Sequence, residues 1–127
     1  MHSHLSFENP PALPQKAVAE VLEQALRDRS AEGEAASVLV GTALNDNDAD
    51  FVERWCREVG TRAVPGSPLL GLAGLCLGHA ARRFGHLSDE ALALVESLAA
   101  RAEADPSDVD GRALDGYDDV RSFLHLW

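Results

Sequence analysis

The strongest constraint on this chain is a set of helix start and stop signals that separate apolar segments. Ser67-Pro68 places a capping residue before a proline, and proline suits the first helical position because its missing N–H costs nothing there. Gly85 marks the end of the apolar stretch that follows. These signals predict a helix over residues 68–84. It is the least polar segment of the chain, so we expect it at the centre of the fold.

Apolar residues at helical spacing predict five further helices, over residues 14–29, 34–44, 48–60, 89–104 and 108–124. Gly33 and Gly60 are interpreted as breaks, and Ser88 and Asp48 (or Asn47) as caps. Asp105-Pro106 predicts a sharp turn before the last helix. The chain has no isoleucine and one tyrosine, so strand-forming residues are sparse. The predicted class is all-α.

Six helices with short connectors predict three antiparallel hairpins in a right-handed stack, a HEAT-like α-solenoid. We expect one domain over residues 14–127, preceded by a loose N-terminal leader at 1–13. Two acidic turns are alike, because each is followed by a valine and then an arginine, Arg54 or Arg112. We expect these arginines to pair with the acidic turns as ties between repeats.

Small residues and cations on the fourth predicted helix indicate close contacts. Gly71, Gly74 and Gly78 fall on one side of this helix, which predicts the close approach of a second helix. Arg82 and Arg83 interrupt an otherwise acidic sequence and are expected to bind neighbouring carboxylates.

The net charge of −10, with Lys16 as the one lysine, limits the classes of partner. A strongly acidic surface repels phosphate backbones and anionic membranes, so it disfavours nucleic-acid and membrane binding. It attracts and steers a basic protein partner.

The sequence also indicates a compartment. Its first residues lack the basic and then apolar regions of a signal peptide, and no apolar run approaches the ~18 residues of a membrane helix. We therefore expect a cytoplasmic protein. Cys56 and Cys76 lie in apolar helical patterns, where free cysteine behaves as a small hydrophobe, although a disulfide stays open.

Residue spacing argues against catalysis, metal binding and a cofactor. Cys76 and His79 lie three residues apart, but no paired CxxC or HExxH spacing accompanies them. We expect His79 to bond a carbonyl or carboxylate across a hairpin. Asp46, Asp48 and Asp50 alternate as in a calcium loop, yet the glycine and glutamate that such a loop requires are replaced by Phe51 and Arg57. The chain is predicted not to be an enzyme.

The run Leu75-Cys76-Leu77-Gly78-His79-Ala80-Ala81-Arg82, the Asp105-Pro106 turn and the segment from Arg112 to Val120 resemble small bacterial HEAT-repeat-like proteins. Some of that group resemble immunity proteins of contact-dependent inhibition and polymorphic toxin systems. The resemblance covers about residues 36–124. It departs from the family pattern at Ala80–Gly85 and at Gly116-Tyr117, which is interpreted as an insertion. The resemblance implies a helical protein that binds and neutralises a toxin.

Charge and resemblance together predict an immunity protein that covers a basic toxin domain with carboxylates. The residues predicted to bind the partner are Asp46, Asp48, Asp50, Asp108, Asp110, Asp115, Asp118 and Asp119. The alternatives are a general scaffold or adaptor without a toxin and, less favoured, an enzyme or metal protein that uses Cys76 and His79. A further alternative is a homodimer that forms through Leu5, Phe7 and Trp127.

Overall fold

The computed structural model describes residues 13–125, and within them it contains helices and turns but no strand. This confirms the all-α prediction for that part of the chain. The expected roles of Leu5, Phe7 and Trp127 fall outside the described residues, as does the predicted leader except for the exposed Leu13. The elements are α1 (Gln15–Arg27), η2 (Arg29–Ala31, a 3-10 turn), α2 (Glu32–Asn45), α3 (Ala49–Arg62), α4 (Pro68–Phe84), α5 (Asp89–Ala104) and α6 (Arg112–Phe123).

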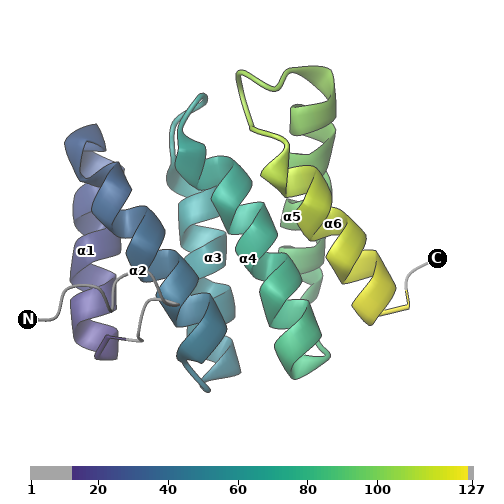
Figure 1. The fold of residues 1–127 in the computed structure, drawn as a ribbon, viewed down its shortest axis with the longest axis horizontal. Coiled ribbons are helices and arrows are strands. Elements are labelled where there is room, and N and C mark those ends of the chain that lie inside the picture. The colour runs from purple at the N-terminus through teal and green to yellow at the C-terminus, as the bar shows by residue number, and fades with distance from the viewer. Residues whose placement is uncertain (1–12, 126–127) are drawn as a thin grey trace, which may run out of the picture.

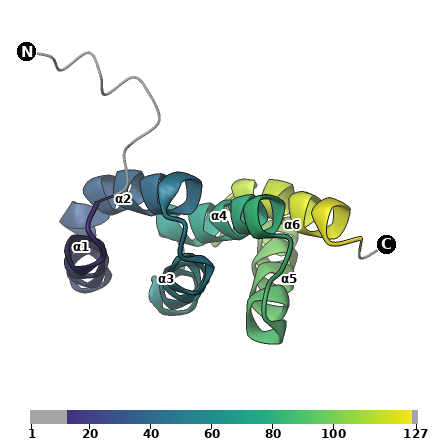
Figure 2. The ribbon, with the colours of Figure 1, turned by 90° about the horizontal axis from the view of Figure 1, so that it is seen from below.

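The helices lie in two layers along the long axis of the molecule. Helices α1, α3 and α5 form one layer and α2, α4 and α6 the other, as the view from below shows (Figure 2). Successive helices alternate in direction, so the α2–α3 connection lies at one end of the helices and the α3–α4 and α5–α6 connections at the other (Figure 1). This alternation places residues that are far apart in sequence at the same end.

Helix α4 is central, as its low polarity predicts. Eleven of its 17 residues are buried, and it contacts α2, α3, α5 and α6. A helix that is apolar on nearly every side must be covered on nearly every side, and here four neighbours cover it. The largest side chains that are fully buried are those of Leu22, Leu39, Leu69, Leu70, Leu77 and Leu98.

The glycines of α4 provide the close contact with α6. A Cβ at Gly71 would overlap the Asp110 carboxylate, and one at Gly74 or Gly78 would press on the α6 backbone. Gly116 is the facing residue on α6, and a Cβ there would overlap the Gly74 carbonyl. The predicted close approach is confirmed. Gly116 is part of this contact, a role that the interpretation of Gly116-Tyr117 as an insertion did not anticipate.

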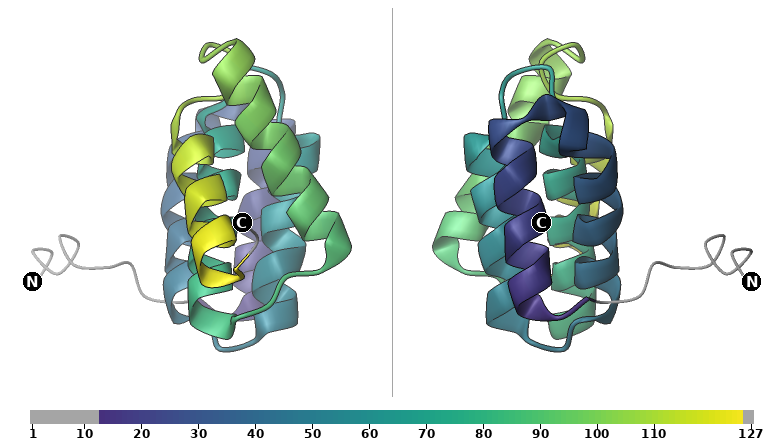
Figure 3. Two further views of the ribbon diagram at one scale, coloured as in Figure 1. Left: turned by 90° about the vertical axis from the view of Figure 1, so that its right-hand side faces the viewer. Right: turned by 90° about the vertical axis from the view of Figure 1, so that its left-hand side faces the viewer.

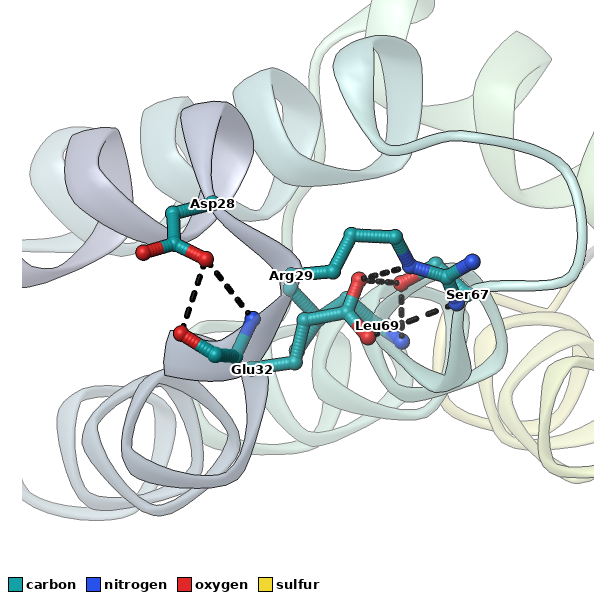
Figure 4. Close-up of polar contacts among 6 residues, drawn as sticks. Asp28, Arg29, Glu32, Ser67 and Leu69 are labelled. Carbon is teal, nitrogen blue, oxygen red and sulfur yellow. Dashed lines mark hydrogen bonds and ion pairs between the residues drawn. The ribbon is translucent and has the colours of Figure 1, made fainter.

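Local caps begin three helices where the sequence predicts them. The side chains of Asp48, Ser67 and Ser88 accept hydrogen bonds from backbone N–H groups of α3, α4 and α5. Ser67 is also a long-range tie, because its hydroxyl donates to the Glu32 carboxylate at 2.7 Å while accepting from Leu69 N–H (Figure 4). The start of α2 is thereby attached to the start of α4.

Three predicted boundaries are wrong. Helix α1 ends at Arg27 because Asp28 is extended, whereas Gly33 lies inside the first turn of α2. Gly60 does not end α3: it is buried inside the helix, against Leu94 and Ala73.

The last helix begins at Arg112 rather than at residue 108. Two hydrogen bonds hold the residues before it in an irregular connection, from Asp108 N–H to the Asp105 carbonyl and from Gly66 N–H to the Asp108 carbonyl. The second bond joins this connection to the α3–α4 loop at the same end of the molecule.

Candidate functional site

The hairpin of α5 and α6 carries most of the net charge. Residues 89–125 contain ten acidic residues and three arginines, a net charge of −7 out of −10 for the whole chain. Residues 13–88 contain ten acidic and eight basic residues. Residues 89–125 hold as many acidic residues as a segment about twice as long, so the asymmetry comes mainly from the density of carboxylates in the last hairpin.

All three arginines of this hairpin face partners inside it. Arg101 donates to both oxygens of Asp108 at 2.7 and 2.8 Å. Arg112 donates to Asp110 at 2.9 Å and to the Pro68 carbonyl at 2.8 Å. The Arg121 guanidinium lies 5.5 Å from the centre of the Tyr117 ring. No arginine in the described part of the hairpin is thus without an internal contact.

These contacts also fix the charge state of two carboxyls. The hydrogen bond from Arg101 lowers the pKa of Asp108, and that from Arg112 lowers the pKa of Asp110. A carboxylate bonded by a guanidinium in this way is favoured in its charged form. Both residues therefore stay ionised, but much of their hydrogen-bonding capacity is used within the protein.

The eight residues predicted to bind a partner do not form one patch. Asp46, Asp48 and Asp50 lie at the α2–α3 turn, at the opposite end of the helices from Asp108 and Asp110 (Figure 1). The remaining three, Asp115, Asp118 and Asp119, lie along α6.

Three of the eight have further contacts within the protein. Asp48 caps α3 and accepts from Gln15 at 3.1 Å, and Asp46 accepts from the Asp48 N–H. Asp119 pairs with Arg82 at 3.1 Å, which confirms the expected ion pair for that arginine.

Among the described residues, Asp50, Asp115 and Asp118 of the predicted set are exposed and have no side-chain partner. The last two belong to α6 of the acidic hairpin. They are the members of the predicted set that are best placed to contact a separate molecule.

A shallow pocket of about 260 Å³ lies on the same hairpin, between α5 and α6. Its lining residues are Glu96, Ala99, Ala100, Glu103, Leu114 and Tyr117. The spacing of Glu96, Ala99 and Glu103 on one face of α5 is visible in the sequence. What the sequence does not show is that α6 leaves this face partly uncovered.

Two arginines outside this hairpin, Arg83 and Arg54, differ from expectation. Arg83 donates to the Ala43 and Asp46 carbonyls, both at 2.8 Å, and to the Asn47 side chain at 3.0 Å, so it bonds carbonyl oxygens rather than a carboxylate. Arg54 is exposed and lies over the ring of Trp55, 5.9 Å from its centre. Its expected pairing with an acidic turn is not found among the described residues, whereas Arg112 bonds both Asp110 and the Pro68 carbonyl.

The residues considered for catalysis lie mainly in the core. Cys56 and Cys76 are free and fully buried, and a hydrogen bond between them together with burial raises the pKa of Cys56. The expected hydrogen bond of His79 is missing at Nδ1, which is buried and has no partner among the described residues. Burial and the nearby Arg82 lower the pKa of His79. No group of three His, Cys, Asp or Glu side chains in residues 13–125 is arranged to hold a metal ion.

None of the helices in residues 13–125 has the length and apolar character needed to cross a membrane. Comparison of the chain with protein-family models, curated proteins and solved structures found no match. The case for a function therefore comes from the charge and geometry of the α5–α6 hairpin.

Proposed function

We propose that this chain is a protein-binding module that associates with a basic protein partner through its acidic α5–α6 hairpin. The observation that carries the proposal is the net charge of −7 on residues 89–125, with all three arginines engaged internally. A cluster of uncompensated carboxylates attracts a positive surface and accelerates its binding.

The finer proposal is an immunity protein that acts in the cytoplasm on a toxin domain. It is supported by the resemblance of residues 36–124 and by the two layers of alternating helices, the arrangement that a HEAT-like stack of hairpins would have (Figures 1 and 2). Covering a positively charged active site with carboxylates would block substrates such as nucleic acids. Fold alone does not license a function, so the charge distribution carries the greater weight.

Within this proposal, two exposed carboxylates of α6 are expected to make the direct contacts. Asp115 and Asp118 are exposed on α6, whereas Asp108 and Asp110 already bond arginines. In the proposed complex the first two contact cations of the partner directly, and the second two contribute to the field at longer range.

The test is capture of partners from the native cells by the tagged chain at low salt, with mass spectrometry, repeated at high salt. The variant Asp115→Lys/Asp118→Lys changes the charge by +4, and Glu20→Lys/Glu34→Lys makes the same change on the first hairpin. We expect a small basic protein that is lost at high salt and lost in the first variant, but retained in the second.

Equal loss in both variants would show that net charge alone matters and would overturn the assignment to the last hairpin. A captured assembly that is insensitive to salt and to both variants would favour the alternative, a scaffold or adaptor that binds through apolar contacts.

A further inference from the structure

The pocket between α5 and α6 combines an apolar floor with a charged rim. Ala99, Ala100, Leu114 and Tyr117 supply the apolar part, and nearly all of the exposed lining is apolar. Glu96 and Glu103 are both exposed on α5. Apolar surface rimmed by polar residues is a feature of interaction sites.

The spacing of the two glutamates gives the pocket a direction. They are seven residues apart on one helix, so they share a face and lie about 10 Å apart along its axis. The Tyr117 hydroxyl donates to Glu96 at 3.5 Å, which places this ring beside one end of the rim. The pocket is therefore a short groove with a carboxylate at each end.

This groove lies at the open end of the stack. Seen from that side, α5 and α6 face the viewer and no other described helix covers them (Figure 3). Of the other two helix pairs in the described residues, α3–α4 has neighbours on both sides, and α1–α2 forms the opposite end of the molecule (Figure 1). The α5–α6 hairpin thus has a free face, and the groove lies in it.

We propose that this groove binds a basic amphipathic helix of a partner protein, in which one large apolar side chain is flanked by a lysine or arginine one turn before it and one turn after it. Positions i and i+7 of a helix match the separation of Glu96 and Glu103, and a residue at i+3 or i+4 lies between them on the same face. The apolar side chain enters the pocket and the two cations meet the two glutamates.

The net charge of the α5–α6 hairpin favours a basic partner helix over a second copy of the chain as the occupant of the groove. Two copies that met through this hairpin would bring net charges of −7 together, which disfavours a dimer at this face. A partner with two cations flanking an apolar residue gains from both features of the groove. The inference deepens the proposed function, on which it rests for the basic nature of the partner.

The experiment is an NMR titration of the full chain at low salt with a synthetic 15-residue alanine-based helix. This probe has one leucine, with arginines four residues before it and three residues after it. Two control peptides replace the leucine, or both arginines, by glutamine. We expect shifts concentrated at Glu96–Glu103 and Leu114–Tyr117 with the probe, and weaker binding with either control.

Three variants of the chain sharpen the test. Glu96→Gln/Glu103→Gln keeps the shape and the acceptor for Tyr117 but should weaken binding about threefold to tenfold. Ala100→Arg places a bulky cation in the groove and should abolish binding. The matched control Glu20→Gln/Glu34→Gln removes the same charge from the first hairpin and should bind as the parent does.

Several results would overturn the inference. Equal weakening by both double variants would mean non-specific attraction. Sedimentation that shows a dimer abolished by Ala100→Arg would assign the groove to a second copy. Shifts at the groove on removal of residues 126–127 would assign it to the chain itself. If a basic partner is captured equally well by the parent chain and by the Ala100→Arg variant, the proposed function stands and this inference fails. If the probe binds the groove but no basic partner is captured, this inference stands and the proposed function fails.

Discussion

Gly116 of α6 lies directly against the backbone of Gly74 on α4, and Gly116 has no room for a side chain. A Cβ at Gly116 would overlap the Gly74 carbonyl oxygen, and a Cβ at Gly74 would lie 3.1 Å from Cα of Ala113. The two helices belong to different hairpins, so this contact sets how closely the last hairpin approaches the rest of the protein.

The first prediction concerns this contact. Gly116→Ala should lower the free energy of unfolding by about 1–3 kcal/mol, because overpacking outweighs the gain in helix propensity. The matched control is Gly33→Ala in α2, where an added Cβ meets nothing within 4 Å. This variant should raise the free energy of unfolding by about 0.5–1 kcal/mol. Urea denaturation followed by circular dichroism measures both, and a stabilised Gly116→Ala would contradict the geometry.

The second prediction compares two arginines. Arg83 bonds the Ala43 and Asp46 carbonyls at the end of α2, whereas Arg54 lies over Trp55 at the surface. Arg83→Ala should lower the free energy of unfolding by about 1–3 kcal/mol, because it leaves partly buried carbonyls without a charged donor. Arg54→Ala should change stability by less than about 1 kcal/mol. Thermal denaturation of the two variants gives the comparison, and equal losses would contradict it.

The third prediction concerns the thiols. Cys56 and Cys76 are free and buried, and a hydrogen bond between them together with burial raises the pKa of Cys56. A protonated, inaccessible thiol is a poor nucleophile. Ellman's reagent at pH 8 should therefore release almost no chromophore from the folded chain and two equivalents in concentrated urea. Rapid reaction of the folded chain would show that the core opens easily, and no reaction in urea would indicate a disulfide.

The fourth prediction concerns acid. The hydrogen bond from Arg112 lowers the pKa of Asp110, so its folded value lies below the unfolded value near 3.8. Its contribution to stability is present above the unfolded pKa and is lost as the pH falls through the folded pKa. The melting temperature of Asp110→Asn should therefore lie below that of the parent at pH 6 and approach it by pH 2. Asn keeps an oxygen that can accept the Arg112 N–H.

The control for this pH series is Asp118→Asn, at an exposed residue with no side-chain partner among the described residues. Its melting temperature should differ from the parent by nearly the same small amount at every pH. A difference for Asp110→Asn that stays constant with pH would show that the ion pair with Arg112 adds no stability.

Helix class and most helix starts followed from the sequence because they depend on local interactions. Ser67 and Ser88 cap their helices through bonds that reach two or three residues ahead. Gly85 ends α4 in the left-handed conformation with φ of 70°, which glycine adopts without strain. The central position of α4 followed from its composition, because so apolar a helix must be covered.

The arrangement of the predicted site residues did not follow from the sequence. Sequence reasoning grouped Asp115 and Asp118 of α6 with Asp46 and Asp48, which lie at the α2–α3 turn. The sequence also did not show that Arg101 pairs with Asp108 and that Arg112 pairs with Asp110, two of the predicted partner-binding residues. Which cation meets which anion depends on how helices cross, and no local rule supplies that information.

By itself, the sequence determined that residues 13–125 would form helices, where most of them begin, and that the chain would be strongly acidic. Only the tertiary structure decided that α6 would pack on α4 through Gly74 and Gly116, and that a groove would stay open between α5 and α6. The reason is physical: caps and helical periodicity act within a few residues, whereas packing depends on the shapes of surfaces that the chain brings together from a distance.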